Sequence, residues 1–247
     1  MNATRNPWGR RMTLPLLGGL AIVVANLLLA PALPAADAPK VQPAAGELVP
    51  LMLDLPRAAF IGTPPEGLKT NSYTEPYDPD KPHPQLMVPR GLKNLAPGSK
   101  LTCSATNITA EALAKLTDDD KDGSSDSITI LSRGKQWVQL DLDSSHEIYA
   151  IMIWHAHDMP KVYHDVIVQV ADAPEFKQQV RTLFNNDQDN SFGLGVGTDR
   201  EYFETHQGRL INAGGVKARY IRFCSKGSTQ SALNEYTELE VFGRPAK

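Results

Sequence analysis

From residue 91 onward, short stretches of the chain alternate hydrophobic and polar residues, and turn residues separate one stretch from the next. This alternation is typical of β-strands with one buried face, because successive side chains of a strand point to opposite faces of a sheet. The stretches predicted as strands are SKLTCSA, SITIL, QWVQLDL, EIYAIMIWH, HDVIVQVA, ARYIRFCS and YTELEVFG. Their spacing predicts an all-β sandwich or barrel. Short helices are expected only at residues 109–116 and 173–179.

Residues 39–90 break this pattern because they are rich in proline. Proline lacks an amide donor and fixes its own φ angle, so long regular elements are not expected there. The segment still contains hydrophobic residues such as Leu51, Leu53 and Phe60. We interpret it as a proline-rich N-terminal arm that packs on the following domain, and a disordered spacer is the alternative.

Residues 1–38 have the order of a secretory signal peptide. Arg5, Arg10 and Arg11 precede an apolar run over residues 14–33, and small residues with an A-x-A cleavage site follow at 36–38. The run is long enough to span a bilayer, so an uncleaved anchor is the alternative, but the prolines around it favour cleavage. The arginine pair also agrees with twin-arginine export. We expect the mature chain to be secreted, periplasmic or part of the cell envelope, with no remaining membrane span.

Composition narrows the classes of function. The chain has 247 residues, 41% of them hydrophobic and 21% charged, which is ordinary for one globular domain with additional chain. The net charge of −3 and the lack of a basic stripe argue against nucleic acid as a partner. The sequence lacks G-x-S-x-G, H-E-x-x-H, C-x-x-C and glycine-rich phosphate loops, so we predict that the protein is not an enzyme.

The chain contains two cysteines, Cys103 and Cys224. Disulfides persist outside the cytoplasm, so export favours a disulfide that ties an early strand to a late one. Two buried free thiols are the alternative, because the sequence alone does not test the geometry of the pair.

An acidic stretch, TDDDKDGSSDS, follows the first predicted helix and begins like a calcium-binding loop of the form D-x-D-x-D-G. An EF-hand needs a bidentate glutamate at loop position twelve and a helix on each side. Counted from Asp118, position twelve is Thr129, and a predicted strand lies there instead of a helix. A calcium sensor of the EF-hand type is therefore not expected. The remaining interpretations are a structural calcium site and a solvated acidic turn.

Six segments carry a resemblance to a known family: NLAPGSKLTCSA, LTDDDKDG, QWVQLDLDSSHEIYAIMIW, HDVIVQVADAPEF, KARYIRFCSKG and YTELEVFG. In this order they resemble the discoidin, or coagulation factor 5/8 type C, family of galactose-binding-like domains, and in particular its secreted bacterial type. The resemblance implies that residues 91–247 form a jelly-roll β-sandwich. It also implies a module that binds sugars, lipid headgroups or proteins and does not catalyse a reaction.

The resemblance further implies a structural calcium ion. Asp118 matches the loop aspartate of the family, and Glu238 matches a glutamate on the last strand that closes the site. Asp120 and Asp122 are expected as additional ligands or carbonyl donors, because calcium takes about six to eight oxygen ligands. Asp119 departs from the family, which usually has glycine at that position.

In the family, the loop that corresponds to residues 155–164 helps to form the ligand face. A second, long loop region at 182–215 supplies amides, carboxylates and aromatic rings, which suit sugar hydroxyls and ring faces. The expected ligand-binding residues are His155, His157, Asp158, Tyr163, His164, Asn185, Asn186, Phe192, Arg200 and Tyr202. Zinc bound by the three histidines and Asp158 is an alternative, and the asparagine-rich loop is alternatively a self-stabilising turn or a second calcium site.

We therefore predict a secreted, non-catalytic binding module that is stabilised by calcium and binds a carbohydrate or cell-surface glycan. A cell-envelope module for protein interaction or adhesion is the alternative, and a metal-dependent hydrolase is less favoured. A shallow polar cleft with one aromatic side chain would favour a sugar, whereas exposed apolar loop tips would favour a protein or a lipid.

Overall fold

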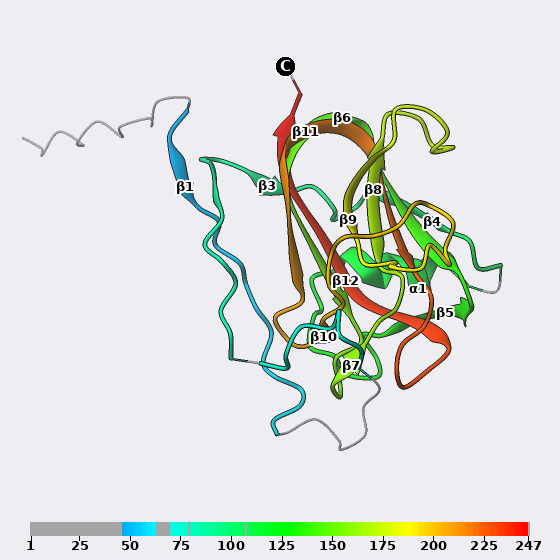
Figure 1. The fold of residues 1–247 in the computed structure, drawn as a ribbon. Coiled ribbons are helices and arrows are strands. Elements are labelled where there is room, and N and C mark those ends of the chain that lie inside the picture. Colours follow the sequence, from blue (N-terminus) through cyan, green and yellow to red (C-terminus); the bar gives the residue numbers. More distant parts are fainter. Residues whose placement is uncertain (1–45, 63–69, 79, 107, 247) are drawn as a thin grey trace, which may run out of the picture. The chain divides into compact units, whose positions relative to one another are not determined.

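The computed structural model describes residues 46–62, 70–78, 80–106 and 108–246 (Figure 1). All of them belong to a unit that spans Pro43–Lys247. The predicted signal peptide, residues 1–38, lies outside the described residues. In the part of the chain that is described, no helix has the length and apolar composition needed to cross a membrane.

The domain consists mostly of β-strands, and the pairings between these strands are antiparallel. The elements in chain order are β1 (Leu48–Pro50), β2 (Met87–Pro89), β3 (Lys93–Asn94), β4 (Lys100–Cys103), α1 (Ala110–Ala114), η1 (Lys115–Thr117, a 3-10 turn), β5 (Thr129–Arg133), β6 (Gln136–His155), β7 (Lys161–Val162), β8 (Ile167–Ala171), β9 (Arg181–Asn185), β10 (Phe203–Glu204), β11 (Arg209–Ser225) and β12 (Leu233–Pro245). The strand order β3-β12-β6-β11-β8-β9 is completed by β4 beside β6 and β5 beside β12. The predicted all-β fold is thereby confirmed.

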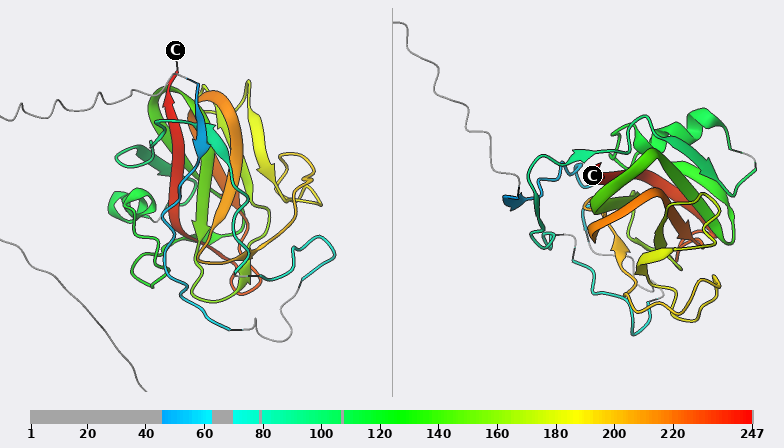
Figure 2. Two further views of the ribbon diagram at one scale, coloured as in Figure 1. Left: turned by 90° about the vertical axis from the view of Figure 1, so that its left-hand side faces the viewer. Right: turned by 90° about the horizontal axis from the view of Figure 1, so that it is seen from above.

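Two long strands, β6 and β11, bend sharply and take part in both layers of the sandwich (Figure 2). The first part of β6 pairs with β4 and the end of β11, and its second part pairs with β12 and the start of β11. The bends coincide with register shifts in the pairing of the two strands. Asp143 in β6 and Gly214 in β11 have φ angles of 63° and 60°, in the left-handed region that permits such a turn. The result is the predicted antiparallel β-sandwich.

The hydrophobic core lies between the two layers and contains alternate residues of the long strands. In β11, Ile221 and Phe223 point into the core, whereas the guanidinium of Arg222 lies outside, 4.5 Å from the centre of the Trp137 ring. Each fully buried side chain of this size stabilises the fold by about 1.5–3 kcal/mol through removal of apolar surface from water. The alternation read from the sequence thus assigns the buried face of this strand.

The first predicted helix is present and the second is not. Thr109 caps α1 by accepting a hydrogen bond from the backbone N–H of Ala112 at 3.2 Å. The prediction of a helix at residues 173–179 is wrong, because Phe176 and Gln179 both have φ angles of 52°. The Phe176 ring instead packs on the guanidinium of Arg222 at 4.1 Å, and this contact across the sheet outweighs local helix propensity.

The predicted disulfide is wrong, because Cys103 and Cys224 are free thiols. Cys103 in β4 lies opposite Val138 of β6, and Cys224 in β11 lies opposite Trp137 of β6. Strands on either side of a third are about 9–10 Å apart, which exceeds the Cα separation of a disulfide. Neighbouring positions of β6 also face opposite sides, so the two thiols point to opposite faces of the layer.

We expect both thiols to remain reduced and unlinked in the folded protein. Alkylation in denaturant without reductant should add two labels, and dithiothreitol should not change the melting temperature. In the native state Cys224 should react slowly, because burial raises the pKa of its thiol to about 12. A chain that takes up no label before reduction would contradict the arrangement of the two strands.

The described parts of the arm contact the domain at several points. β1 pairs with β2 within the arm, and the backbone N–H of Glu75 donates to the carbonyl of Glu201 at 2.7 Å. The guanidinium of Arg200 donates to three consecutive carbonyls of the arm, at residues 72–74. These contacts place residues 72–75 of the arm against the segment that precedes β10.

Candidate functional site

A polar cavity of about 410 Å³ lies where the arm meets the loops that follow β7 and β9. Ligand pockets of proteins span roughly 300–1,000 Å³, so this cavity is large enough for a small polar molecule. The arm contributes Asn71 and Tyr73. The domain contributes, among others, His164, Asp165, Asn186, Asp189, Glu201 and Lys226.

Asn186 is one of the residues that line this cavity, and its buried amide nitrogen has no hydrogen-bond partner. The residue follows β9 directly and is only 2% exposed. Its Oδ1 accepts the backbone N–H of Val166 at 2.6 Å, and this bond fixes the orientation of the amide. An unpaired buried donor costs about 1–3 kcal/mol, and an acceptor atom on a bound molecule would remove that cost.

Three aspartates gather beside Asn186. Asp165, Asp187 and Asp189 each present a carboxylate oxygen within 4.8 Å of the others, and no other group of three metal-ligating side chains occurs among the described residues. Burial and the neighbouring charge of Asp165 raise the pKa of Asp187, although backbone N–H groups of Ser191 and Phe192 donate to its carboxylate. An acidic cluster of this kind can accept hydrogen bonds from ligand hydroxyls or hold a cation.

One lysine offsets part of this negative charge. Lys226 Nζ donates to Ser191 Oγ at 2.7 Å and lies 3.4 Å from Asp165 Oδ2, and Ser191 Oγ also donates to Asp165. The cavity still contains more carboxylates than cations, because Asp189 and Glu201 also line it. Its charge therefore favours a neutral ligand rich in hydroxyl groups over an anionic one.

The arm side of the cavity is held by Glu201. Its Oε2 accepts from Asn71 Nδ2 at 2.8 Å and from Thr74 Oγ1 at 3.2 Å, and His164 Nδ1 lies 2.8 Å from its Oε1. Burial alone would raise the pKa of Glu201, but these bonds lower it below its usual value. The side chain of Tyr73 stands at the rim with 54% of its surface exposed and offers an aromatic face.

Two of the expected ligand-binding residues, His164 and Asn186, line the cavity. Of the others, Arg200 binds the arm, and Asn185 holds its own loop through the carbonyl of Gly195. Exposed Asp158 pairs with Lys161 Nζ at 2.8 Å. Half-buried Phe192 lies against the ammonium of Lys135.

The remaining expected ligand-binding residues are buried in the domain. His155 and Tyr163 stack with ring centres 4.3 Å apart, and His155 Nδ1 lies 2.9 Å from Glu204 Oε2. His157 Nε2 bonds to the carbonyl of Lys121, and Tyr202 is buried as well. The prediction that His155, His157 and Tyr163 contact a ligand is not supported by the geometry, because long-range packing covers these side chains.

The structure does not bring the three histidines together. His155 faces Glu204, His157 faces a backbone carbonyl, and His164 faces Glu201. Their ring nitrogens do not form a group with ligand spacing among the described residues. The alternative of a zinc site built from these histidines therefore has no support in the geometry.

The predicted calcium loop is only partly assembled. Asp118 lies close enough to Glu238 to raise the pKa of that carboxyl. By contrast, Asp120 Oδ1 accepts the N–H of Asp122, and Asp122 Oδ1 accepts from Ser124 and Ser127. Asp120 and Asp122 are exposed and stabilise the turn, so their prediction as ligands is not supported by the geometry. Asp119 has a φ angle of 74°, so it adopts the conformation for which the family uses glycine.

Glu238 has the properties of a cation ligand. It is fully buried, its Oε1 accepts the N–H of Asp119 at 3.2 Å, and its Oε2 has no partner. Burial, with the nearby charges of Asp118 and Glu240, raises the pKa of Glu238 to about 8. An adjacent lysine, Lys121, is committed elsewhere, because its Nζ lies 2.7 Å from Asp119 Oδ1 and 2.8 Å from Glu240 Oε1.

Several cavity residues were missed by reading the sequence. Asp165 adjoins the predicted His164 in HDVIVQVA, so this neighbour offered a signal. Asn71 and Tyr73 offered none, because they lie in the proline-rich arm, and Asn71 meets Glu201 across 130 positions of sequence. Lys226 likewise follows the end of β11 and reaches the cavity only through the pairing of distant strands.

Comparisons with known proteins find structural matches only. No protein-family model and no curated protein matches the sequence. The structural matches include CBM32 modules of bacterial proteins.

Three of these matches illustrate the likeness. The module CpGH89CBM32-6 produced by Clostridium perfringens matches with a TM-score of 0.41 and 14% identity over 61% of this chain and 99% of its own. Chitosan-binding module 1 from a chitosanase/glucanase of Paenibacillus sp. IK-5 matches with a TM-score of 0.43 and 19% identity over 62% and 100%. CpGH89 from Clostridium perfringens matches with a TM-score of 0.45 and 16% identity over 62% of this chain, which spans only 15% of that enzyme.

Proposed function

We propose that the protein is a secreted, non-catalytic binding module and that its polar cavity takes a neutral carbohydrate. The observation that carries the proposal is the oriented, unpartnered amide nitrogen of Asn186, a residue of the cavity lining whose buried nitrogen a ligand would pair. A sugar hydroxyl oxygen can accept from this nitrogen, and sugar hydroxyl hydrogens can donate to Asp165 and Asp189. The exposed ring of Tyr73 supplies a face for the C–H side of a sugar ring.

A structural calcium ion is part of the same proposal. The unpartnered Oε2 of Glu238 and the nearby Asp118 fit a cation, and backbone carbonyls of the loop would complete its ligand set. Bound calcium would connect the loop after η1 to β12. The ion would neutralise buried negative charge and would not take part in sugar binding.

Tyr73→Ala tests the cavity with little risk to folding, because this ring is exposed. We expect retention of the full-length chain on an immobilised neutral polysaccharide, and about 5- to 10-fold weaker binding for Tyr73→Ala through loss of the aromatic face. Asn186→Ala should weaken binding at least as much, although loss of its bond to Val166 also costs stability. Affinity electrophoresis over a panel of galactan, mannan, glucan and chitosan measures both effects.

Tyr73→Phe is the matched control, since it keeps the ring and should bind like the wild type. Met52→Ala removes another exposed apolar side chain of the arm, outside the cavity, and should also bind normally. Equal retention of Tyr73→Ala and Met52→Ala would refute the cavity as the sugar site. Failure of folded wild-type protein to bind any neutral glycan would refute the proposed function.

A role in protein interaction is the second candidate. Met52, Ile61 and Val196 are well-exposed apolar residues on the arm and on the loop before β10. Exposed apolar side chains of this kind favour a protein or lipid partner when they gather into one patch. Met52→Ala removes one of these side chains, so a partner that contacts it would bind this variant less tightly while sugar retention is unchanged.

A further inference from the structure

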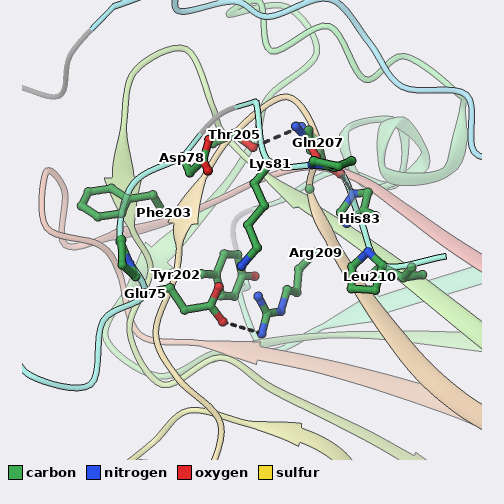
Figure 3. Close-up of a pocket in the computed structure, with 14 residues that line it drawn as sticks. Glu75, Asp78, Lys81, His83, Tyr202, Phe203, Thr205, Gln207, Arg209 and Leu210 are labelled. Carbon is green, nitrogen blue, oxygen red and sulfur yellow. Dashed lines mark hydrogen bonds and ion pairs between the residues drawn. The ribbon is translucent and has the colours of Figure 1, made fainter. Parts of the chain in front are cut away.

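A second cavity, of about 290 Å³, lies between the arm and the strands β10 and β11 (Figure 3). It is distinct from the sugar cavity, although both follow the same stretch of the arm. Asn71 and Tyr73 line the first cavity, and residues from Glu75 to Pro84 line the second. Glu201 and Tyr202, which are consecutive in sequence, likewise line different cavities.

One side of this second cavity contains an arginine whose carboxylate partner comes from the arm. Arg209 Nη2 lies 3.0 Å from Glu75 Oε1, and its guanidinium lies 4.7 Å from the centre of the Tyr202 ring. The Tyr202 hydroxyl is buried and has no hydrogen-bond partner. The Arg209–Glu75 ion pair and the Tyr202 ring therefore form a polar wall of the cavity, and the hydroxyl group of Tyr202 lacks a hydrogen-bond partner.

Lys81 adds a cation that has no ion-pair partner among the described residues. Its side chain extends into the cavity toward Glu75, Tyr202 and Arg209 (Figure 3), but it forms no ion pair with the residues drawn there. Asp78, the other acidic lining residue, lies beside Thr205 and away from that ammonium (Figure 3). The cavity lining thus holds two carboxylates, Glu75 and Asp78, and two cations, Arg209 and Lys81, and Lys81 is the cation whose ammonium has no ion-pair partner among the described residues.

The backbone of the arm holds Lys81 in this position. Its N–H donates to the carbonyl of Asp78 at 3.3 Å, and His83 Nε2 donates to the carbonyl of Gln207 at 2.6 Å. Pro82 and Pro84 restrict the φ angles on either side of His83. Because these contacts fix the backbone at Lys81, only the side chain has to be ordered when the ammonium binds an anion.

We propose that this second cavity is a subsite for an anionic group on a polysaccharide, a carboxylate or a sulfate ester, which Lys81 binds. The proposal rests on the proposed carbohydrate function and extends it. The sugar cavity, with its excess of carboxylates, takes a neutral unit, and the second cavity takes a charged unit. The arm lines both cavities, so one acidic polysaccharide can occupy the two sites together.

Affinity electrophoresis and titration calorimetry of the full-length chain test the proposal. The probes are neutral galactan and mannan, uronate-containing polygalacturonate and alginate, and sulfated carrageenan. We expect tighter binding to at least one acidic polymer than to the neutral ones, with a preference that weakens as salt rises. Comparison of the uronate polymers with carrageenan shows which anion is preferred.

Lys81→Gln should weaken binding to the acidic polymer about 10-fold or more through loss of a charge-assisted contact, and Lys81→Arg should restore most of it. Lys177→Gln removes the same charge from another exposed site and should have no effect. Lys81→Gln should also leave neutral-sugar binding unchanged, whereas Tyr73→Ala weakens it. Equal affinities of Lys81→Gln and Lys177→Gln, or no preference for any acidic polymer, would overturn the second site without affecting the first.

Discussion

Replacement of Asn234 by alanine is expected to lower the free energy of unfolding by about 3–5 kcal/mol, among the largest effects of a single substitution in this domain. Asn234 lies near the start of β12 and is fully buried. Its Oδ1 accepts from Ser225 Oγ at 2.7 Å and from the N–H of Gly227 at 2.8 Å. Its Nδ2 donates to the carbonyls of Ser132 and Gly134, at 2.7 and 2.9 Å.

The expected loss of unfolding free energy is large because alanine leaves the hydrogen-bond partners of the Asn234 amide unpaired. The amide joins the end of β11 to the turn between β5 and β6, and each buried group that loses its partner costs about 1–3 kcal/mol. Equilibrium denaturation in urea measures the loss. Asn212→Ala is the matched control, because Asn212 is exposed and makes one local bond to the N–H of Gly214. Equal destabilisation by the two substitutions would contradict the role assigned to Asn234.

The strands could be predicted from the sequence because their burial alternates within each segment. In β11 the period of two separates Ile221 and Phe223 from Arg222 without any knowledge of neighbouring strands. The stretches QWVQLDL and EIYAIMIWH were expected as two strands, but they form the single strand β6 with a bend at Asp143. The polar residues between the two stretches resemble a turn in the sequence. The pairing of β6 with β11 on both sides of these residues shows that they belong to one strand.

The candidate site could be predicted only in part, because its residues come from distant segments. His155 was expected to face a ligand, yet the rings of Tyr163 and Tyr236 pack against it. Its partner Glu204 lies 49 positions away, and no local pattern indicates that distance. The arm was recognised by its prolines, but its contribution to both cavities depends on bonds such as Asn71 to Glu201.

The same limitation applies to the acidic loop. The spacing of its aspartates resembles a ligand set, yet the carboxylates of Asp120 and Asp122 accept hydrogen bonds from backbone N–H groups of the turn. In the sequence, only the resemblance to the family points to Glu238 as a ligand. Its burial and its unpartnered oxygen make it the group with the strongest electrostatic consequence in this region.

Without a divalent cation, the stability of the protein is expected to fall as pH rises from about 4.5 through about 8, because the folded state holds a proton on Glu238 that the unfolded chain releases at lower pH. Burial is the main cause of the raised pKa, and the negative charges of Asp118 and Glu240 add to it while Lys121 opposes it. The raised pKa means that Glu238 favours folding most below pH 4.5, and this contribution is lost at pH values above 8. One pKa unit corresponds to about 1.4 kcal/mol, so the decline should amount to a few kcal/mol.

Glu238→Gln removes the carboxyl with this raised pKa and should make the decline shallower in the presence of a chelator, while Glu240 and Asp187, whose pKa values are also raised, keep part of it. Glu175→Gln, at an exposed position, should keep the wild-type decline. Calcium at 100 times its dissociation constant would stabilise the wild type by about 2.7 kcal/mol and should leave Glu238→Gln almost unchanged. Melting temperatures between pH 5 and 9, with calcium and with chelator, measure these effects.

Parallel profiles for the wild type and Glu238→Gln in chelator would show that Glu238 is already ionised in the fold. An equal response of both proteins to calcium would place the ion elsewhere, and the cluster of Asp165, Asp187 and Asp189 would then be the next position to test.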